Sequence, residues 1–268
     1  MMKINSMSIA VFDSGFGGIS VLKKLLDILP NENYIYLGDN CNIPYGDKSK
    51  EEITQLSIKI LDFLIKQNCK MAVIACNTIT ASSYDILKER YNIPIIEVIS
   101  NGVEDIIDNT KNNNVSIMAT EFTVHSNVYY DKIFNYNKKI KVTQVACQKL
   151  CPMIENNWCS YDDRLNVLEE YVKRIDDDSD TLLLACTHYP FIMDDIKDVI
   201  DRKKTNIKNI IDPSQKIALS IKKYLIDNNL VNTSGGNLKF FTTGNKKDFN
   251  DFVSKYIKID YELERIVL

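Results

Sequence analysis

The chain has 268 residues and a mass of 30.8 kDa, the length of one large domain or two small ones. Hydrophobic residues make up 45% and charged residues 26%, a composition that can bury a core and that excludes a disordered chain. The 33 basic and 36 acidic side chains give a formal net charge of −3, without the basic excess typical of a general nucleic-acid-binding protein.

No segment predicts export, a membrane anchor or a metal centre. The first apolar run soon reaches Asp13 and has no small-residue cleavage site, and no stretch approaches 18 apolar residues without a charge. Seven cysteines, an odd number, then indicate reduced thiols in a cytoplasmic protein with no membrane partner. Because there is no CxxC pair and only His125 and His188 as histidines, we expect no structural zinc site.

Short apolar runs that predict buried strands alternate with amphipathic segments that predict helices. The strands are predicted, in chain order, at 8–12, 34–38, 71–76, 93–99, 115–120, 141–147, 181–186, 208–213 and 238–244. The helices are predicted at 19–29, 51–67, 78–91, 163–175 and 214–226. This alternation, with near-continuous apolar strands, predicts an α/β fold with largely parallel sheets.

Two segments of the chain share one plan. MAVIACNT (71–78) and TLLLACTH (181–188) are each a buried strand ending in Ala-Cys, followed by small polar residues. Chance similarity of two α/β strands would also explain so short a match. The alternative is that the chain has two α/β lobes and that the two cysteines occupy the equivalent position in each lobe. No Pro/Gly/Ser-rich linker separates such lobes, so the chain would cross between them more than once.

Polar clusters follow four of the predicted strands, at the edge where open α/β sheets bind ligands. They are Asp13-Ser14-Gly15, Pro44-Tyr45-Gly46, Cys76-Asn77-Thr78 and Cys186-Thr187-His188. The segment DSGFGG (13–18) lacks the GxGxxG spacing and no GxxxxGK[ST] sequence occurs, so a dinucleotide or P-loop site is not indicated. Backbone N–H groups of such a turn can still hold a carboxylate.

The two strand-end cysteines are candidate acid/base groups. A cysteine that enters a helix N-terminus meets free N–H groups and the positive end of the helix dipole, which favour the thiolate. Cys76 and Cys186, facing one pocket from opposite sides, would form a pair of proton-transfer bases; the alternative is that both are small core residues. Asp13 either forms a turn or orients a proton beside a thiol, and His188 is either structural or sets thiol protonation.

The remaining candidates have ordinary interpretations on composition alone. Glu155 would be a helix acid, and His125 a surface or capping residue with no assigned role. The other cysteines show no paired pattern and are interpreted as structural; they are Cys41, Cys69, Cys147, Cys151 and Cys159.

Five segments together resemble one known family. They are VFDSGFGGISVLKKL (11–25), YLGDNCNIPYGDKS (36–49), IACNTITA (74–81), ACQKLCPMIE (146–155) and LLACTHYP (183–190). Their order and spacing are similar to those of the glutamate racemases, within the cofactor-independent aspartate/glutamate racemase superfamily, over most of the chain. The resemblance implies two α/β lobes with the active site in the cleft between them. We place the first lobe at 1–97 plus 209–268 and the second at 98–208.

The resemblance also implies an activity, namely two-base racemisation of free glutamate at Cα without a cofactor or a metal. Cys76 and Cys186 would exchange the α-proton on opposite faces, assisted by Asp13 and His188 respectively, with Glu155 as a further active-site acid. Positions matching substrate-binding residues of the family are Asp13, Ser14, Tyr45, Gly46, Asn77, Thr78, Thr123, Thr187 and His188. The product D-glutamate would supply peptidoglycan synthesis, and similar enzymes are often dimers.

The sequence departs from the usual family pattern outside the cysteine pair. Asn40-Cys41-Asn42 replaces the usual Thr-Ala-Arg, Glu121-Phe122 stands where Pro-Gly is common, and Gln148-Lys149 and Cys151 interrupt the segment before Pro152. These changes leave side-chain specificity and oligomer contacts open. The alternatives are an aspartate racemase, another racemase of the superfamily, or a non-catalytic α/β protein that binds an amino acid.

Overall fold

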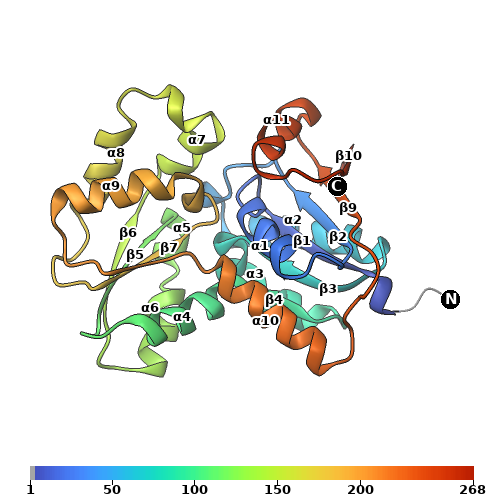
Figure 1. Ribbon diagram of the computed structural model, residues 1–268, viewed down its shortest axis with the longest axis horizontal. Coiled ribbons are helices and arrows are strands. Elements are labelled where there is room, and N and C mark those ends of the chain that lie inside the picture. Colours follow the sequence, from blue (N-terminus) through green and yellow to red (C-terminus); the bar gives the residue numbers. More distant parts are fainter. Residues whose placement is uncertain (1–3) are drawn as a thin grey trace. The chain divides into compact units, whose positions relative to one another are not determined.

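The computed structural model describes residues 4–268, which form two compact α/β units (Figure 1). Unit 1 comprises the chain up to Val98 together with Ser214–Leu268, and unit 2 is the continuous segment Ile99–Pro213. Unit 2 is thus inserted into unit 1, and the chain passes between the units twice.

Unit 1 contains a six-stranded, all-parallel sheet with the order β10-β9-β2-β1-β3-β4. Its strands are β1 (Ser8–Asp13), β2 (Tyr34–Gly38), β3 (Cys69–Ile74), β4 (Ile95–Glu97), β9 (Leu238–Thr242) and β10 (Glu262–Arg265). Its helices are α1 (Ile19–Ile28), α2 (Lys50–Lys66), α3 (Asn77–Arg90), α10 (Ser214–Asp227) and α11 (Lys246–Tyr256). The helices cover both faces of this sheet, so the central strands are buried on both sides and are apolar at almost every position (Figure 1).

A buried ion pair lies at the amino end of the unit 1 sheet. The Nζ of Lys70, on β3, donates to Glu32 Oε2 at 2.5 Å and to the carbonyl oxygens of Asn5 and Leu230 at 2.8 Å. The second carboxylate oxygen of Glu32 accepts the Asn232 N–H at 2.7 Å. Both charged side chains are almost fully buried, and each polar atom of the pair has a partner. The pair therefore ties β3 to three distant segments of unit 1.

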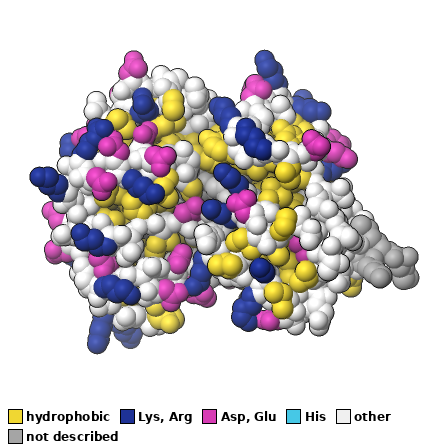
Figure 2. Space-filling model, in the orientation of Figure 1, with side chains coloured by type: hydrophobic (Ala, Val, Ile, Leu, Met, Phe, Trp, Pro, Cys, Tyr) yellow, Lys and Arg dark blue, Asp and Glu magenta, His cyan; other side chains and the backbone are white. Residues whose placement is uncertain are grey.

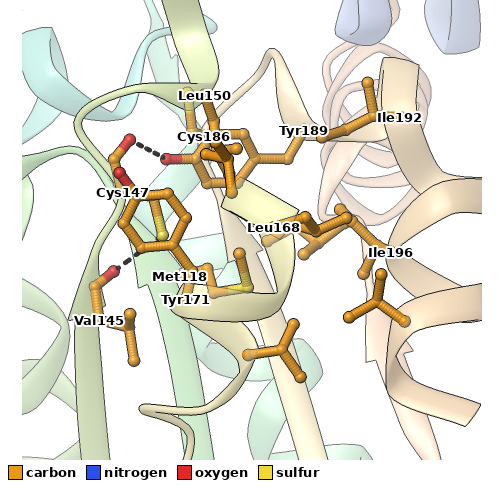
Figure 3. Close-up of a cluster of buried hydrophobic side chains, with 14 of the residues drawn as sticks. Met118, Val145, Cys147, Leu150, Leu168, Tyr171, Cys186, Tyr189, Ile192 and Ile196 are labelled. Atoms are coloured by element: carbon orange, nitrogen blue, oxygen red, sulfur yellow. Dashed lines mark hydrogen bonds between the residues drawn. The ribbon is translucent and has the colours of Figure 1, made fainter. Parts of the chain in front are cut away.

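Unit 2 contains a four-stranded parallel sheet with the order β6-β5-β7-β8. Its strands are β5 (Asn114–Ala119), β6 (Lys141–Ala146), β7 (Thr181–Ala185) and β8 (Asn209–Ile211). Its helices are α4 (which begins one residue earlier, Val98–Asn109), α5 (Glu121–His125), α6 (Val128–Tyr136), α7 (Leu150–Glu155), α8 (Arg164–Val172) and α9 (Met193–Lys203). One buried cluster of this unit, which includes Met118, Leu168 and Tyr189, surrounds Cys186 (Figure 3).

A carboxylate is anchored at the amino end of the unit 2 sheet. Asp180 precedes β7, and its Oδ1 accepts the hydroxyls of Thr110 and Thr181 at 2.9 and 2.8 Å. Its Oδ2 accepts the backbone N–H groups of Lys111 and Asn112 at 2.7 and 2.9 Å. Burial alone would raise the pKa of Asp180, but these four donors outweigh it and hold the pKa below its usual value. Asp180 therefore fixes the loop that enters β5.

The predicted α/β class with parallel sheets in two lobes is confirmed, and each predicted strand has a counterpart within two or three residues at its ends. The strand predicted at 208–213 is β8, and it pairs with β7 in unit 2. Unit 2 consequently ends at Pro213, five residues beyond the expected lobe boundary at 208. Strand β10 was not predicted, because its residues are mostly exposed and charged.

No helix in residues 4–268 is long and apolar enough to cross a membrane. On the face shown in Figure 2, basic and acidic side chains are interspersed over both units, as the balanced composition predicts.

Candidate active site

The two sheets repeat one strand order around their central strands. In unit 1 the order β2-β1-β3-β4 follows the chain as second, first, third and fourth, and β6-β5-β7-β8 repeats it in unit 2. In this topology the connections that follow the first and the third strand run to opposite sides of the sheet. Open α/β sheets bind ligands at that point, in a crevice outside the carboxyl ends of these two strands. Cys76 follows the third strand of unit 1, and Cys186 follows the third strand of unit 2. The equivalence suggested by the two Ala-Cys segments is therefore present in the topology.

In unit 1 the carboxyl ends of β1 and β3 bring Asp13 and Cys76 close to one serine. Asp13 ends β1 and is fully buried, and its Oδ1 accepts the Gly15 N–H at 2.9 Å. The Ser14 hydroxyl lies 3.5 Å from both Asp13 Oδ1 and Cys76 Sγ, so it links the carboxylate to the thiol. A side chain at Gly18 would come within 2.9 Å of Asp13 Cβ, so only glycine lets α1 begin this close to the crevice.

A second carboxylate, Asp39, holds the predicted Tyr45 motif in place. Its Oδ2 accepts the Tyr45 hydroxyl at 2.6 Å, and its Oδ1 accepts the Thr243 hydroxyl, also at 2.6 Å. Asn42 donates to both oxygens of Asp39 at 3.0 Å. Burial, the charge of Asp39 and its hydrogen bond raise the pKa of Tyr45, whose hydroxyl therefore stays protonated. Sequence reasoning missed Asp39, although it stands in the quoted segment YLGDN.

The surroundings of Cys76 favour its protonated thiol. Burial and then the nearby Asp13 charge raise the pKa of Cys76 to about 12, although N–H groups of Ile79 and Ser14 and the Ser14 hydroxyl act in the opposite direction. Cys76 is the N-cap of α3, so the helix N-terminus does contribute as expected. The expectation of a thiolate was nevertheless wrong in these surroundings, because burial in an apolar strand end outweighs the helix.

In unit 2 three side chains after the third strand and on α7 form a relay. Cys186 Sγ lies 3.6 Å from His188 Nδ1, and His188 Nε2 lies 2.8 Å from Glu155 Oε1. Burial opposes a charge on His188, but its hydrogen bonds with Cys186 and Glu155 outweigh burial and raise the pKa of the imidazole well above its usual value. The thiol, the imidazole and the carboxylate predicted at these positions are therefore brought together.

A further thiol contacts this relay. Cys151 Sγ lies 3.3 Å from Cys186 Sγ. Cys151 and Glu155 are four residues apart on α7, so they lie on one face of the helix. Burial, followed by Cys151, raises the pKa of Cys186 well above its usual value, while His188 lowers it. Sequence reasoning interpreted Cys151 as structural, since its contact spans 35 residues of sequence.

The candidate substrate-binding residues lie at the same two sheet edges. Asn77 and Thr78 open α3 and are buried, as is Thr187 between Cys186 and His188. Thr123 is fully buried in α5, where its hydroxyl meets the Thr120 hydroxyl at 2.9 Å. Thr120 follows Ala119, which pairs with Ala185 just before Cys186, so Thr120 and Cys186 follow neighbouring strand ends. Sequence reasoning missed Thr120, and it placed His125 correctly on the surface.

Comparison with known proteins agrees with this arrangement. A family model described as Asp/Glu/Hydantoin racemase matches residues 9–217. A glutamate racemase of Fusobacterium nucleatum is 40% identical over 268 residues, which cover 99% of this chain and 99% of that protein. The crystal structure of a Francisella tularensis glutamate racemase with D-glutamate matches with a TM-score of 0.89 and 35% identity over 98% of both chains.

A glutamate racemase isoform of Bacillus anthracis matches with a TM-score of 0.92 and 28% identity, again over 98% of both chains. Together with the repeated strand order and the thiols that follow its third strands, these matches confirm the resemblance seen in the sequence. The chain belongs to the Asp/Glu/Hydantoin racemase family.

Proposed function

We propose that this protein is a glutamate racemase that interconverts L- and D-glutamate by two-base proton transfer at Cα. The observation that carries the proposal is the repetition of one buried thiol, Cys76 or Cys186, after the third strand of each sheet, with a proton-accepting partner beside each. Amino-acid racemisation needs one base and one acid at a single carbon, and a pair of similar groups can exchange these roles. Glutamate is the substrate indicated by the relatives that match the whole chain.

The two thiols act from opposite faces of the bound substrate. One thiolate removes the α-proton, and the other thiol delivers a proton to the far face, so the configuration at Cα inverts. For the reverse reaction, the two residues exchange roles. No electron sink such as a pyridoxal ring is required of the protein, because hydrogen bonds to the α-carboxylate stabilise the charge that develops beside it.

Each thiol needs a route for losing its proton, because burial keeps both protonated before substrate binds. On Cys186 the proton passes to His188, whose imidazolium form is stabilised by Glu155. On Cys76 the proton passes through Ser14 or directly to Asp13. The positively charged α-ammonium group of bound glutamate further favours the thiolate.

The polar groups at the sheet edges hold the carboxylates of glutamate. Candidate donors are the hydroxyls and amides of Ser14, Tyr45, Gly46, Asn77, Thr78, Thr123 and Thr187. The Tyr45 hydroxyl donates its proton to Asp39, so the donors that this segment offers to a carboxylate are the backbone N–H groups of Tyr45 and Gly46, and the bond to Asp39 fixes the position of the segment. Asp13 and His188 complete the set beside the reacting carbon.

The cellular role that follows is the supply of D-glutamate for peptidoglycan synthesis in the cytoplasm. A homodimer is the expected assembly by likeness to the family, and free glutamate is the expected partner.

The test is racemisation by purified protein that has been dialysed against a chelator and receives no added cofactor. Circular dichroism should show that L-glutamate and D-glutamate both decay to the racemate, with aspartate slower by about 100-fold or more, since a pocket fitted to one chain length misplaces another. Alkylation of the thiols should abolish the reaction, and bound glutamate should slow that loss. Faster turnover of aspartate would identify an aspartate racemase, and binding without turnover would identify a non-catalytic protein.

A further inference from the structure

A cluster of three metal-binding side chains lies in unit 2 around one of the proposed catalytic thiols. The Sγ atoms of Cys151 and Cys186 and a ring nitrogen of His188 all lie within 4.8 Å of one another. Proton transfer at Cα requires Cys186 and His188, but it gives Cys151 no task.

The spacing of these atoms is that of ligands around one tetrahedral ion. Zinc–sulfur bonds of about 2.3 Å and zinc–nitrogen bonds of about 2.0 Å separate two sulfur ligands by about 3.8 Å, and a sulfur from a nitrogen by about 3.5 Å. The corresponding distances are 3.3 Å between the two sulfurs and 3.6 Å between Cys186 Sγ and His188 Nδ1. A shift of a few tenths of an ångström in the sulfur atoms would admit the ion.

The surroundings of His188 also match a metal ligand. Its Nδ1 faces Cys186, while its Nε2 lies 2.8 Å from Glu155 Oε1. A metal-bound histidine usually donates its other ring N–H to a carboxylate, which fixes the tautomer and strengthens the ligand. Glu155 supplies that carboxylate from the same helix face as Cys151. The negative charges of two thiolates balance the two positive charges of a divalent cation. The net charge that remains at the buried site would be the single negative charge of Glu155.

We propose that Cys151, Cys186 and His188 form a binding site for a thiophilic divalent cation, with Zn²⁺ as its representative, and that the bound cation inhibits racemisation. Binding releases the two thiol protons to solvent and engages the sulfur lone pair that Cys186 needs to accept the α-proton. Half-buried Cys151 provides access from solvent to the two buried ligands. The inhibitory effect rests on the proposed function, whereas binding of the ion does not.

The binding test uses Co²⁺ as a spectroscopic substitute for Zn²⁺, in buffer with a phosphine reductant and without thiol additives. Wild-type protein should bind one equivalent and show the near-ultraviolet absorption of a thiolate–cobalt bond, which Zn²⁺ should displace. Cys151→Ser should lose most of this absorption. Cys151→Ala, which removes the sulfur ligand and adds no volume, provides a second variant if the serine variant fails to fold. Cys159→Ser removes an exposed thiol and is the matched control, which should behave as wild type.

The activity test titrates Zn²⁺ against glutamate racemisation. The Zn²⁺ concentration for half inhibition should rise at least about tenfold in Cys151→Ser relative to wild type and Cys159→Ser. Removing even an outer hydrogen-bond partner of a metal ligand lowers metal affinity by about 10–100-fold, so removing a ligand should have at least this effect. A chelator should restore full activity. The proposal falls if Cys151→Ser matches wild type in both tests, or if only a reductant reverses the inhibition. A cobalt spectrum without racemase activity would instead overturn the proposed function alone.

Discussion

The thiols of the two units occupy the same place in the topology but have different neighbours. Cys76 in unit 1 lies beside a hydroxyl and the buried carboxylate of Asp13, whose charge opposes a thiolate. Cys186 in unit 2 lies beside an imidazole whose pKa is raised, and this neighbour favours a thiolate. A repeated sheet therefore does not make the two proposed acid/base groups chemically equal, and under the proposed mechanism each thiol loses its proton by a different route.

The largest expected effect comes from removing either thiol. Cys76→Ser and Cys186→Ser should each lower the rate of racemisation by about 10⁴-fold, because a hydroxyl is a far weaker acid than a thiol and cannot serve as the base. Each variant keeps one thiol, so each should still eliminate a good leaving group from a β-substituted glutamate analogue, a reaction that needs one base only.

The two variants should prefer opposite enantiomers of that analogue. The rate at which each variant forms the elimination product from each enantiomer would measure this preference. Cys159→Ser, which changes an exposed thiol, should leave racemisation unchanged. The same enantiomer preference in both variants would contradict the assignment of the thiols to opposite faces.

The next largest effect concerns the buried charge of unit 1. Lys70→Met should reduce the free energy of unfolding by about 3–5 kcal/mol, because it leaves Glu32 buried without its ion partner. Chemical denaturation monitored by circular dichroism would measure the loss. The double variant Lys70→Met, Glu32→Leu is the control, and it should recover much of the stability. If Lys70→Met were as stable as wild type, the ion pair with Glu32 would not stabilise unit 1.

A smaller effect should separate the proton partners of the two thiols. Asp13→Asn and His188→Asn should each slow racemisation by about 100-fold, within the range for a group that assists proton transfer. At equilibrium the enantiomers are equally stable, so kcat/KM stays equal in both directions and cannot distinguish the two variants.

The deuterium isotope effect at Cα can distinguish them. It should increase for one enantiomer in Asp13→Asn and for the other in His188→Asn, because each change slows proton removal on one face. If the isotope effect increased for the same enantiomer in both variants, Asp13 and His188 would both assist proton removal on the same face of the substrate.

The smallest effect tests the anchored carboxylate of unit 2. Asp180→Asn should reduce the free energy of unfolding by about 2 kcal/mol near pH 7. The reason is that an amide nitrogen would face N–H donors that now bind the carboxylate. The pKa of Asp180 is lowered by folding, so its stabilisation is present above the unfolded pKa of about 4 and is lost as the pH falls through the folded value.

The difference in stability between wild type and Asp180→Asn should therefore shrink below about pH 4. Thermal unfolding across pH 3–7 would measure it. A difference that stays constant over this range would mean that the amide, and not the charge, is responsible.

Sequence reasoning predicted the elements that are buried and missed features that depend on distant contacts. Parallel strands covered on both faces are apolar throughout, so β1, β3 and β7 are visible in the sequence. Strand β10 lies at a sheet edge with exposed charges, so it has no such pattern.

The candidate site was predicted only in part for the same reason. The strand-end thiols and their nearest neighbours in sequence were found from local pattern. Asp39 and Cys151 were missed since their roles arise from contacts formed across the fold. The pKa direction of Cys76 was missed because the helix terminus can be read from the sequence, whereas the burial that outweighs it cannot.

The insertion of unit 2 into unit 1 has a consequence for synthesis on the ribosome. Residues 99–213 form one continuous unit that can fold as soon as they have emerged, whereas unit 1 must wait for the last part of the chain. Until residues 238–242 are made, β2 lacks its partner β9 and remains an open edge of the sheet, available for pairing with another nascent chain. Unit 2, the middle of the chain, is thus expected to mature before unit 1, and the newly made N-terminal part of the unit 1 sheet is the part that most needs a chaperone.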